Sequence, residues 1–286
     1  MARLGVIVKR NVKEALEALR RVHKAARGTP ILVEDNGAIS QAEVPEGVRI
    51  VGRNEFAKVS DFIVVIGGDG TLIHAASLVR DRVVPIVGIN LGHVGFLTAV
   101  SIDEIERAIP LALEGGLPHL DRMRLDVRVT SMMGDVVTEK RVLNDVALTP
   151  TVMARLAEYR IVQDGQLVTS LRGDGIIVST PTGSTAYSMA AGGSIIWPGM
   201  NAIAVTPICP HSLTQRPLIL DATGDLDIRL VGKSEVTATL DGQSSCRFTT
   251  GDILTVTIAP VPTRLLSLPG GSFFQTLRSK LHWGST

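Results

Sequence analysis

The sequence predicts an α/β domain with a parallel sheet, then an all-β domain of the β-sandwich type, and a C-terminal helix that returns to the first domain. Short aliphatic runs alternate with helical patterns up to about residue 120, the hydrophobic period then shifts to two, and a helical pattern reappears near the C-terminus. Strand–helix alternation is typical of a parallel sheet covered by helices, and period two is typical of half-buried strands. We therefore expect domains at 1–120 and 121–262, with a segment at 263–286 packing back on the first domain.

Within the first domain, aliphatic runs bounded by polar or glycine residues predict the strands. They are expected at 4–8, 31–33, 62–66 and 84–88. Apolar residues at helical spacing predict helices at 13–26 and between residues 71 and 80. Ser101 and Glu104 have the spacing of a capping box, and the apolar stripe after them predicts a further helix, which a pair of glycines ends.

Beyond residue 120, apolar and polar residues alternate. The clearest alternating apolar sets are Leu125, Val127 and Val129; Leu226, Ile228 and Leu230; Val236, Ala238 and Leu240; and Leu254, Val256 and Ile258. Asp164-Gly165 is a strong hairpin signal between strands at 159–163 and 167–171. Ser272 is expected to cap a short C-terminal helix with one apolar face.

Composition excludes several classes of function. The 286 residues include 29 Lys+Arg and 28 Asp+Glu, so the formal charge of +1 lacks the cationic excess of a nucleic-acid-binding protein. Aromatic residues make up 3%, too few for a platform that stacks single-stranded bases. Residues 175–215 contain no charged side chain, but prolines and glycines interrupt them, so we expect no membrane span.

Only two cysteines are present, Cys209 and Cys246. Two thiols cannot build a disulfide framework or a zinc site with four cysteine ligands. We interpret them as reduced thiols and expect a cytoplasmic protein.

The turn Gly67-Gly68-Asp69-Gly70-Thr71 follows a predicted strand and opens a helix. In an open α/β sheet, ligands bind at the carboxyl ends of the strands. Glycines permit positive φ and close approach of a ligand, and the amides of a helix start suit phosphate oxygens. No lysine follows, so this is neither a Walker loop nor a dinucleotide fingerprint. Asp69 is left with three interpretations: a cap of the helix, a general base on a hydroxyl, or a carboxylate that orients a metal.

Charge around this turn is sparse, because no Lys or Arg lies between Lys58 and Arg80. Phosphoryl transfer at the turn would therefore need Mg²⁺ or another divalent cation, helped by distant cations such as Arg155 or Arg172. His74, one helical turn further on, is a candidate for the same cleft; a histidine with a purely structural partner is the alternative.

Residues 179–188 include seven hydroxyl-bearing side chains. They suit a polar ligand with ribose, amide and diphosphate groups, and Tyr187 can stack or hydrogen-bond; hydroxyls that bind their own backbone are the alternative. Asn144 and Asp145 suit a sugar diol or an adenine edge, although such a pair is also common in turns. The segment 241–243 is most typical of a hairpin turn.

Taken in order, these motifs resemble those of the NAD kinase family over roughly residues 60–275. The matching elements are 67–71, 143–145, 174–188, 207–213 with 216–217, and 241–243. The resemblance implies phosphorylation of the 2′-hydroxyl of the adenosine ribose of NAD, with ATP as donor and inorganic polyphosphate left open. It also implies a homodimer or homotetramer with the site near a subunit interface.

By similarity, Asp69 is the proton acceptor, Asn144 and Asp145 hold the adenosine part, and Asp174 with the turn at 185–187 holds the ribose and nicotinamide side. Asp145 stands where the family often has a glutamate. The expected binding residues are Gly67, Gly68, Gly70, Thr71, His74, Asn144, Asp145, Arg155, Arg172, Asp174, Thr182, Thr185, Ala186, Tyr187, Ser188 and Gln243. The similarity assigns a binding role less firmly to Arg155, Arg172 and Gln243, and some of these residues would reach a neighbouring subunit's site.

Two other classes fit part of the pattern. A lipid or sphingoid kinase shares the glycine turn, but the sequence has no amphipathic basic helix for a membrane surface. A sensor that binds NAD(H) without phosphoryl transfer would gain nothing from Asp69. The sequence leaves open whether NADH is a substrate, whether NADPH feeds back, and which subunit supplies Arg155 and Arg172.

Overall fold

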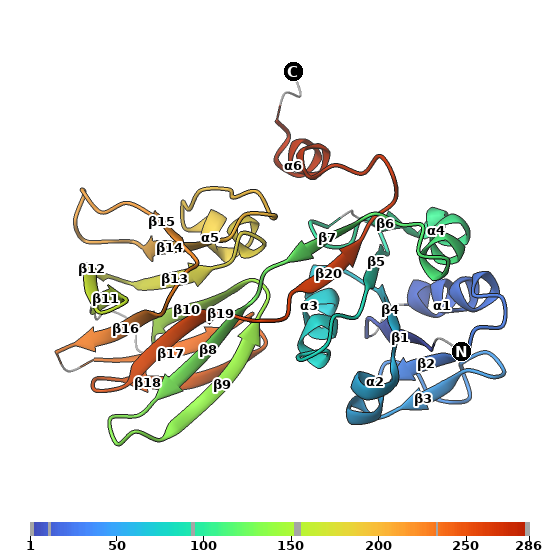
Figure 1. The fold of residues 1–286 in the computed structure, drawn as a ribbon, viewed down its shortest axis with the longest axis horizontal. Helices are drawn as coiled ribbons and strands as arrows, with labels where there is room; N and C mark the ends of the chain where they lie inside the picture. The colour runs from blue at the N-terminus through green and yellow to red at the C-terminus, as the bar shows by residue number, and fades with distance from the viewer. Residues whose placement is uncertain (1–2, 11–12, 93–94, 152–155, 233, 284–286) are drawn as a thin grey trace. The chain divides into compact units, whose positions relative to one another are not determined.

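The computed structural model describes residues 3–10, 13–92, 95–151, 156–232 and 234–283. The chain forms two compact units, one that ends at Asp121 and resumes at Thr263, and one that spans Arg122–Pro262 (Figure 1). The predicted fold class is confirmed: the first unit is α/β with a mainly parallel sheet and receives the C-terminal helix, and the second consists of antiparallel sheets. Among the described residues, no helix combines the length and apolar character needed to cross a bilayer.

The first unit is built on an eight-stranded sheet in the order β3-β2-β1-β4-β5-β20-β7, with β6 beside β5. Its strands are β1 (Leu4–Val8), β2 (Ile31–Glu34), β3 (Arg49–Val51), β4 (Phe62–Ile66), β5 (Ile86–Asn90), β6 (Val100–Ser101), β7 (His119–Arg122) and β20 (Thr263–Leu266). The strand expected at 84–88 lies two residues later, and β3 and β6 were not predicted because so short a strand leaves no periodic pattern.

Helices cover both faces of this sheet. They are α1 (Lys13–Ala25), α2 (Arg53–Val59), α3 (Asp69–Leu78) and α4 (Ile105–Leu113), which follows the 3-10 turn η1 (Ile102–Glu104). α1 and α4 lie side by side on one face and share a core with Val6 and Val64 (Figure 1). On the other face, the Phe56 ring packs on Gly5 so closely that a Cβ there would lie 2.7 Å from it. The capping box of Ser101 and Glu104 is confirmed.

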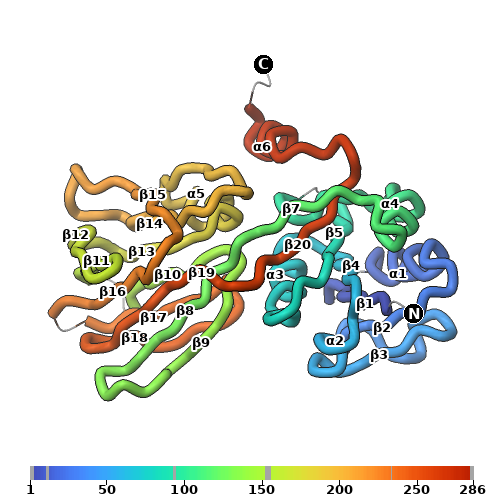
Figure 2. The backbone as a smooth tube through the Cα atoms, in the orientation of Figure 1, coloured from blue at the N-terminus to red at the C-terminus, as the bar shows by residue number. Residues whose placement is uncertain are grey.

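The C-terminal segment completes the first sheet, because β20 pairs in parallel with β5 and lies between β5 and β7 (Figure 2). Arg264 donates two hydrogen bonds of 2.8 Å to the carboxylate of Asp121. The helix α6 (Phe273–Leu281) follows and buries Leu277. Ser272 precedes it but makes no side-chain capping bond, so that expectation was wrong.

The second unit is a sandwich of two six-stranded antiparallel sheets, ordered β15-β14-β13-β10-β17-β18 and β12-β11-β16-β19-β8-β9. Apolar side chains of both sheets form one core, as period-two strands require. The Asp164-Gly165 hairpin is confirmed, with φ of 49° and 78°. The elements are β8 (Leu125–Thr130), β9 (Val136–Val142), β10 (Asp145–Pro150), β11 (Ala157–Gln163), β12 (Gln166–Gly173), β13 (Gly175–Ser179), η2 (Gly183–Thr185), α5 (Tyr187–Ala190), β14 (Ala202–Ile208), β15 (Leu218–Asp221), β16 (Leu226–Val231), β17 (Glu235–Leu240), β18 (Ser244–Thr249) and β19 (Ile253–Ile258).

Candidate functional site

The glycine turn lies where β4 ends and α3 begins, at the carboxyl edge of the first sheet. A Cβ on Gly67 would lie 2.6 Å from the Thr71 hydroxyl, so only glycine fits there, whereas Gly68 and Gly70 have open space beside their Cα atoms. None of the three has positive φ, so the turn does not use the positive φ that glycine permits. The glycines instead allow close packing at Gly67 and leave room for a ligand at the helix start.

The Asp69 carboxylate binds the segment 95–98, which follows β5. Its Oδ2 accepts the amide of Phe96 at 2.9 Å, and its Oδ1 accepts the amides of Leu97 at 3.0 Å and Thr98 at 3.2 Å and the Thr98 hydroxyl at 3.3 Å. A Cβ on Gly95 would collide with this carboxylate. The start of α3 has no side-chain capping bond, so the helix-cap interpretation of Asp69 was wrong.

Sequence reasoning missed the segment 95–98. The sequence marks this segment only by Gly95 followed by two large apolar residues. That pattern occurs in many loops and does not indicate a functional site. Asp69 and this segment are about 27 residues apart, and only the parallel pairing of β4 with β5 brings them together.

A cation that sequence reasoning missed lies next to the glycine turn. Lys9 follows β1, its amide donates to the Ile66 carbonyl at 2.8 Å, and its Cβ lies 3.1 Å from where a Cβ on Gly67 would be. Because β1 and β4 are neighbours in the sheet, a lysine far away in the sequence lies beside the turn, in addition to the distant arginines that the sequence suggested.

His74 is held by Glu34, the last residue of β2. Its Nε2 lies 3.1 Å from Glu34 Oε1, which also accepts from Arg53 Nε at 3.0 Å. The Glu34 side chain is fully buried. Burial raises the pKa of Glu34, but the hydrogen bond and charge of His74 and the charge of Arg53 outweigh it, so the pKa lies below its usual range. His74 thus has the structural partner that sequence reasoning kept as an alternative.

In the second unit, Asn144 and Asp145 line a cavity of about 380 Å³, a size typical of small-molecule sites. Asp145 is 7% exposed. Burial, and then the charge of Asp241, raise the pKa of Asp145 to about 7. The buried Oδ1 of Asn144 has no hydrogen-bond partner among the described residues. The other lining residues are Ala147, Thr149, Ala186, Tyr187, Thr239, Asp241 and Gly242.

Three hydroxyls of the hydroxyl-rich turn donate to backbone carbonyls. Thr180, Ser184 and Thr185 donate to the carbonyls of Leu143, Pro181 and Thr182, at 2.6, 2.6 and 3.2 Å. The Ser188 hydroxyl is buried and lies 2.8 Å from that of Thr206. Of this turn, Ala186 and Tyr187 face the cavity, while Thr182 is buried with its hydroxyl unpartnered among the described residues.

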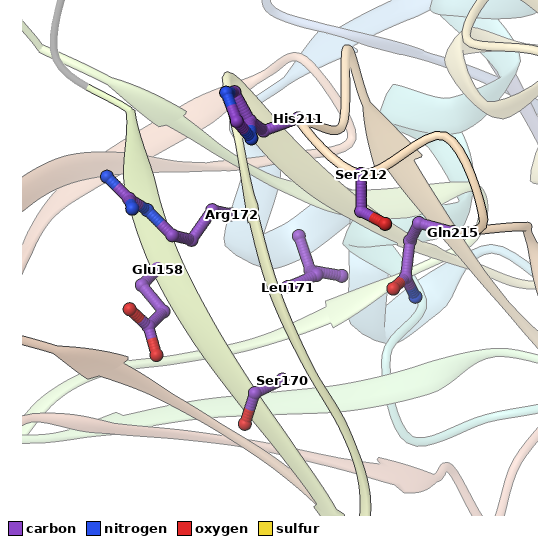
Figure 3. A pocket seen from close by; sticks show the side chains of 7 residues that line it. All are labelled: Glu158, Ser170, Leu171, Arg172, His211, Ser212 and Gln215. Atoms are coloured by element: carbon purple, nitrogen blue, oxygen red, sulfur yellow. The ribbon is translucent and has the colours of Figure 1, made fainter.

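Arg172 lies in another cavity of the second unit, of about 270 Å³ (Figure 3). It stands opposite Glu158 on neighbouring strands, and its carbonyl accepts the amide of His211 at 2.8 Å. Figure 3 shows Ser212 and Gln215 projecting toward this cavity from the loop after β14. Asp174 and Gln243 are exposed and line neither cavity, and Arg155 lies outside the described residues.

Among the described residues, no group of three or more His, Cys, Asp or Glu side chains is arranged to hold a metal ion. Mg²⁺ is commonly bound by one or two carboxylates together with substrate phosphates. A lone carboxylate beside an open helix start, as at Asp69, fits that second arrangement.

Family models of two domains together match most of the chain. The ATP-NAD kinase N-terminal domain matches residues 4–117, and the ATP-NAD kinase C-terminal domain matches residues 143–268. The chain belongs to the ATP-NAD kinase family.

Its relatives agree with this family over most of their length. An NAD kinase of Geobacter sulfurreducens is 40% identical over 264 residues, covering 91% of this chain and 90% of the relative. An NAD kinase of Syntrophobacter fumaroxidans is 38% identical over 285 residues, covering 99% of both. Among solved structures, an Archaeoglobus fulgidus NAD kinase in complex with ATP has a TM-score of 0.72 and 26% identity, covering 98% of both chains. Yeast NADH kinase complexed with NADH, at 24% identity and a TM-score of 0.91, covers 100% of this chain and 89% of its own and supports the fold.

Proposed function

We propose that this protein is an NAD kinase that transfers the γ-phosphoryl group of ATP to the 2′-hydroxyl of the adenosine ribose of NAD. One observation supports this most: a carboxylate, Asp69, stands at the helix start that an anionic ligand would occupy. That carboxylate also holds the segment 95–98 through four hydrogen bonds, and its place beside a phosphate site makes it a candidate to accept the proton of an attacking hydroxyl. In phosphoryl transfer, Asp69 accepts the proton of the attacking hydroxyl, and the amides around Gly68 and Gly70 contact the phosphates.

The second unit supplies the recognition of NAD in this proposal. Asn144 and Asp145 bind the adenosine part, and Tyr187 packs on the ligand, since all three line one cavity of suitable volume. Thr185 and Ala186 belong to the same turn. We keep Asp174, Arg172, Arg155 and Gln243 as contacts to the nicotinamide side or to a neighbouring subunit in a homodimer or homotetramer.

A divalent cation, Mg²⁺ first, is proposed to accompany the phosphates of ATP at the helix start beside Asp69, held by the phosphate oxygens. It would neutralise negative charge on the transferred group. Lys9 adds positive charge beside the same turn. The thiols of Cys209 and Cys246 are free, which agrees with our proposal of a cytoplasmic location.

The test is a coupled assay in which purified protein, NAD, ATP and Mg²⁺ are mixed and NADP is read by an NADP-specific dehydrogenase. We expect NADP only when all components are present, and its loss with excess EDTA and recovery with added Mg²⁺. Turnover that survives removal of divalent cations would refute the metal proposal. If the protein binds NAD but forms no NADP, it is a sensor and not a kinase. If it phosphorylates sphingosine instead of NAD, it is a lipid kinase. Replacing ATP by polyphosphate and NAD by NADH extends the same assay to donor and substrate range.

Gly95→Ala is expected to lower turnover at least tenfold, because the added methyl group collides with the Asp69 carboxylate and must displace it or the segment 95–98. Gly92→Ala is the matched control, since a Cβ at Gly92 would meet no described residue within 4 Å. NADP formation by both variants is measured beside their melting temperatures. Equal turnover of the two would show that the position of the Asp69 carboxylate does not limit the reaction.

A further inference from the structure

The two carboxylates that line the cavity of the second unit face each other across a pair of strands. Val146 of β10 stands opposite Leu240 of β17, and continuing this antiparallel register puts Asp145 opposite Asp241. The Asp241 amide donates to the Asp145 carbonyl at 2.9 Å. Like charges directly opposite destabilise a sheet, so this pairing needs a reason.

The Asp241 side chain binds the backbone of the very residues that line the cavity. Its Oδ2 accepts the amide of Leu143 at 2.8 Å, and its Oδ1 accepts the amides of Asn144 at 2.7 Å and Asp145 at 3.1 Å. Three consecutive amides therefore converge on one carboxylate, which determines how this turn enters β10.

The opposite side of the turn is held by the segment after β13. Thr180 donates its hydroxyl to the Leu143 carbonyl at 2.6 Å and its amide to the Asn144 carbonyl at 2.8 Å. With amides held by Asp241 and carbonyls held by Thr180, the peptide from Leu143 to Asp145 has little freedom. A ligand meets the Asn144 and Asp145 side chains already oriented.

Asp241 also acts on Asp145 electrostatically. Of the residues that line the cavity, those that titrate are Asp145, Asp241 and Tyr187. The negative charge of Asp241 adds to burial in raising the pKa of Asp145. The pKa of Asp241 itself is raised by burial, and the three amides and the charge of Arg124 oppose that increase. Near neutral pH, Asp145 can then hold a proton and both donate and accept a hydrogen bond.

We propose that Asp241 is a positioning residue that sets the geometry of Asn144 and Asp145 for the adenosine part of NAD. This rests on the proposed function, and it assigns a role to a residue that sequence reasoning treated as part of a hairpin turn. Asp241 does not need to touch the ligand; it acts through the turn it holds.

Asp241→Asn tests the proposal, because Asn-Gly retains the left-handed turn (φ 51° and 64°) but turns an amide group toward backbone donors. We expect the KM for NAD to rise at least tenfold, the KM for ATP to change less than twofold, and kcat to change less than the KM for NAD. Because the like charge is gone, the inflection in the pH dependence of NAD affinity should move to lower pH by at least half a unit.

Asp164→Asn is the matched control. Asp164 also precedes a glycine in a left-handed hairpin turn of the same unit, and its side chain accepts the amide of Asp225 at 3.1 Å. Unlike Asp241, it lines neither cavity. Asp241→Glu retains the negative charge but moves it by one methylene group. The KM for NAD should rise in this variant while the pH inflection stays unchanged. Asp241→Glu also tests the proposal if Asp241→Asn folds poorly. If Asp241→Asn has the same NAD affinity and the same pH inflection as Asp164→Asn, the proposal is overturned. Calorimetric titration with NAD gives the affinity without turnover, so the proposal is judged separately from kinase activity, which the wild-type assay decides.

Discussion

Asp69→Asn is expected to lower NADP formation by about 10²–10⁴-fold, the range typical of losing a general base. The amide side chain has nearly the same shape but cannot take a proton from the ribose hydroxyl at neutral pH. The NAD affinity should change less than threefold, because the residues assigned to NAD recognition belong to the second unit. Steady-state kinetics in the coupled assay, with NAD titration by calorimetry, measures both quantities.

The contacts of Asp69 require a control for its structural role. Asparagine turns an NH₂ group toward the amides of the segment 95–98, and a lost hydrogen bond there costs about 1–3 kcal/mol. Thr98→Val removes one donor to Asp69 and leaves the carboxylate in place. We expect this variant to keep turnover within about tenfold of wild type. If Asp69→Asn retains near-normal turnover, or falls no further than Thr98→Val, Asp69 is not the proton acceptor.

Asp145→Asn is expected to stabilise the protein at alkaline pH, because it removes a buried carboxylate that resists ionisation. The folded-state pKa of about 7 lies above the ordinary value of 3.8. Between these values the native state holds a proton that the unfolded chain has released, so this group lowers the free energy of unfolding as pH rises from about 4 to about 7. Above pH 7 the free energy of unfolding is lowered by the full amount. The difference of about three units between the folded and ordinary pKa values sets an upper limit of about 4 kcal/mol.

Urea denaturation of wild type and Asp145→Asn at pH 5 and pH 8 measures this effect. The gain should be larger at pH 8, and NAD affinity should fall although stability rises. Asp225→Asn, at an exposed aspartate of the same unit, should change the free energy of unfolding by less than about 0.5 kcal/mol at either pH. A gain independent of pH, or a loss at pH 8, would mean that Asp145 is ionised without cost in the native state.

The sequence alone was sufficient for the fold class, because aliphatic runs, capping residues and Asp-Gly turns are local signals. The runs at 4–8 and 62–66 became β1 and β4 unchanged, and Asp164-Gly165 formed its hairpin. The same local signals failed for β3 and for the cap at Ser272, where packing decides the outcome.

For the candidate site, the sequence determined which chemistry is available: one carboxylate in a glycine turn, an amide–acid pair and a hydroxyl-rich turn. It did not determine their partners. The contacts of Asp69 with 95–98, of His74 with Glu34, and of Asp241 with Leu143, Asn144 and Asp145 join residues 27, 40 and about 97 positions apart. Such contacts depend on which strands become neighbours, and strand order follows from burying the whole core rather than from any short stretch of residues. Tertiary structure therefore decided that the Thr180 hydroxyl binds the Leu143 carbonyl, and that a hairpin aspartate holds the cavity's amide–acid pair.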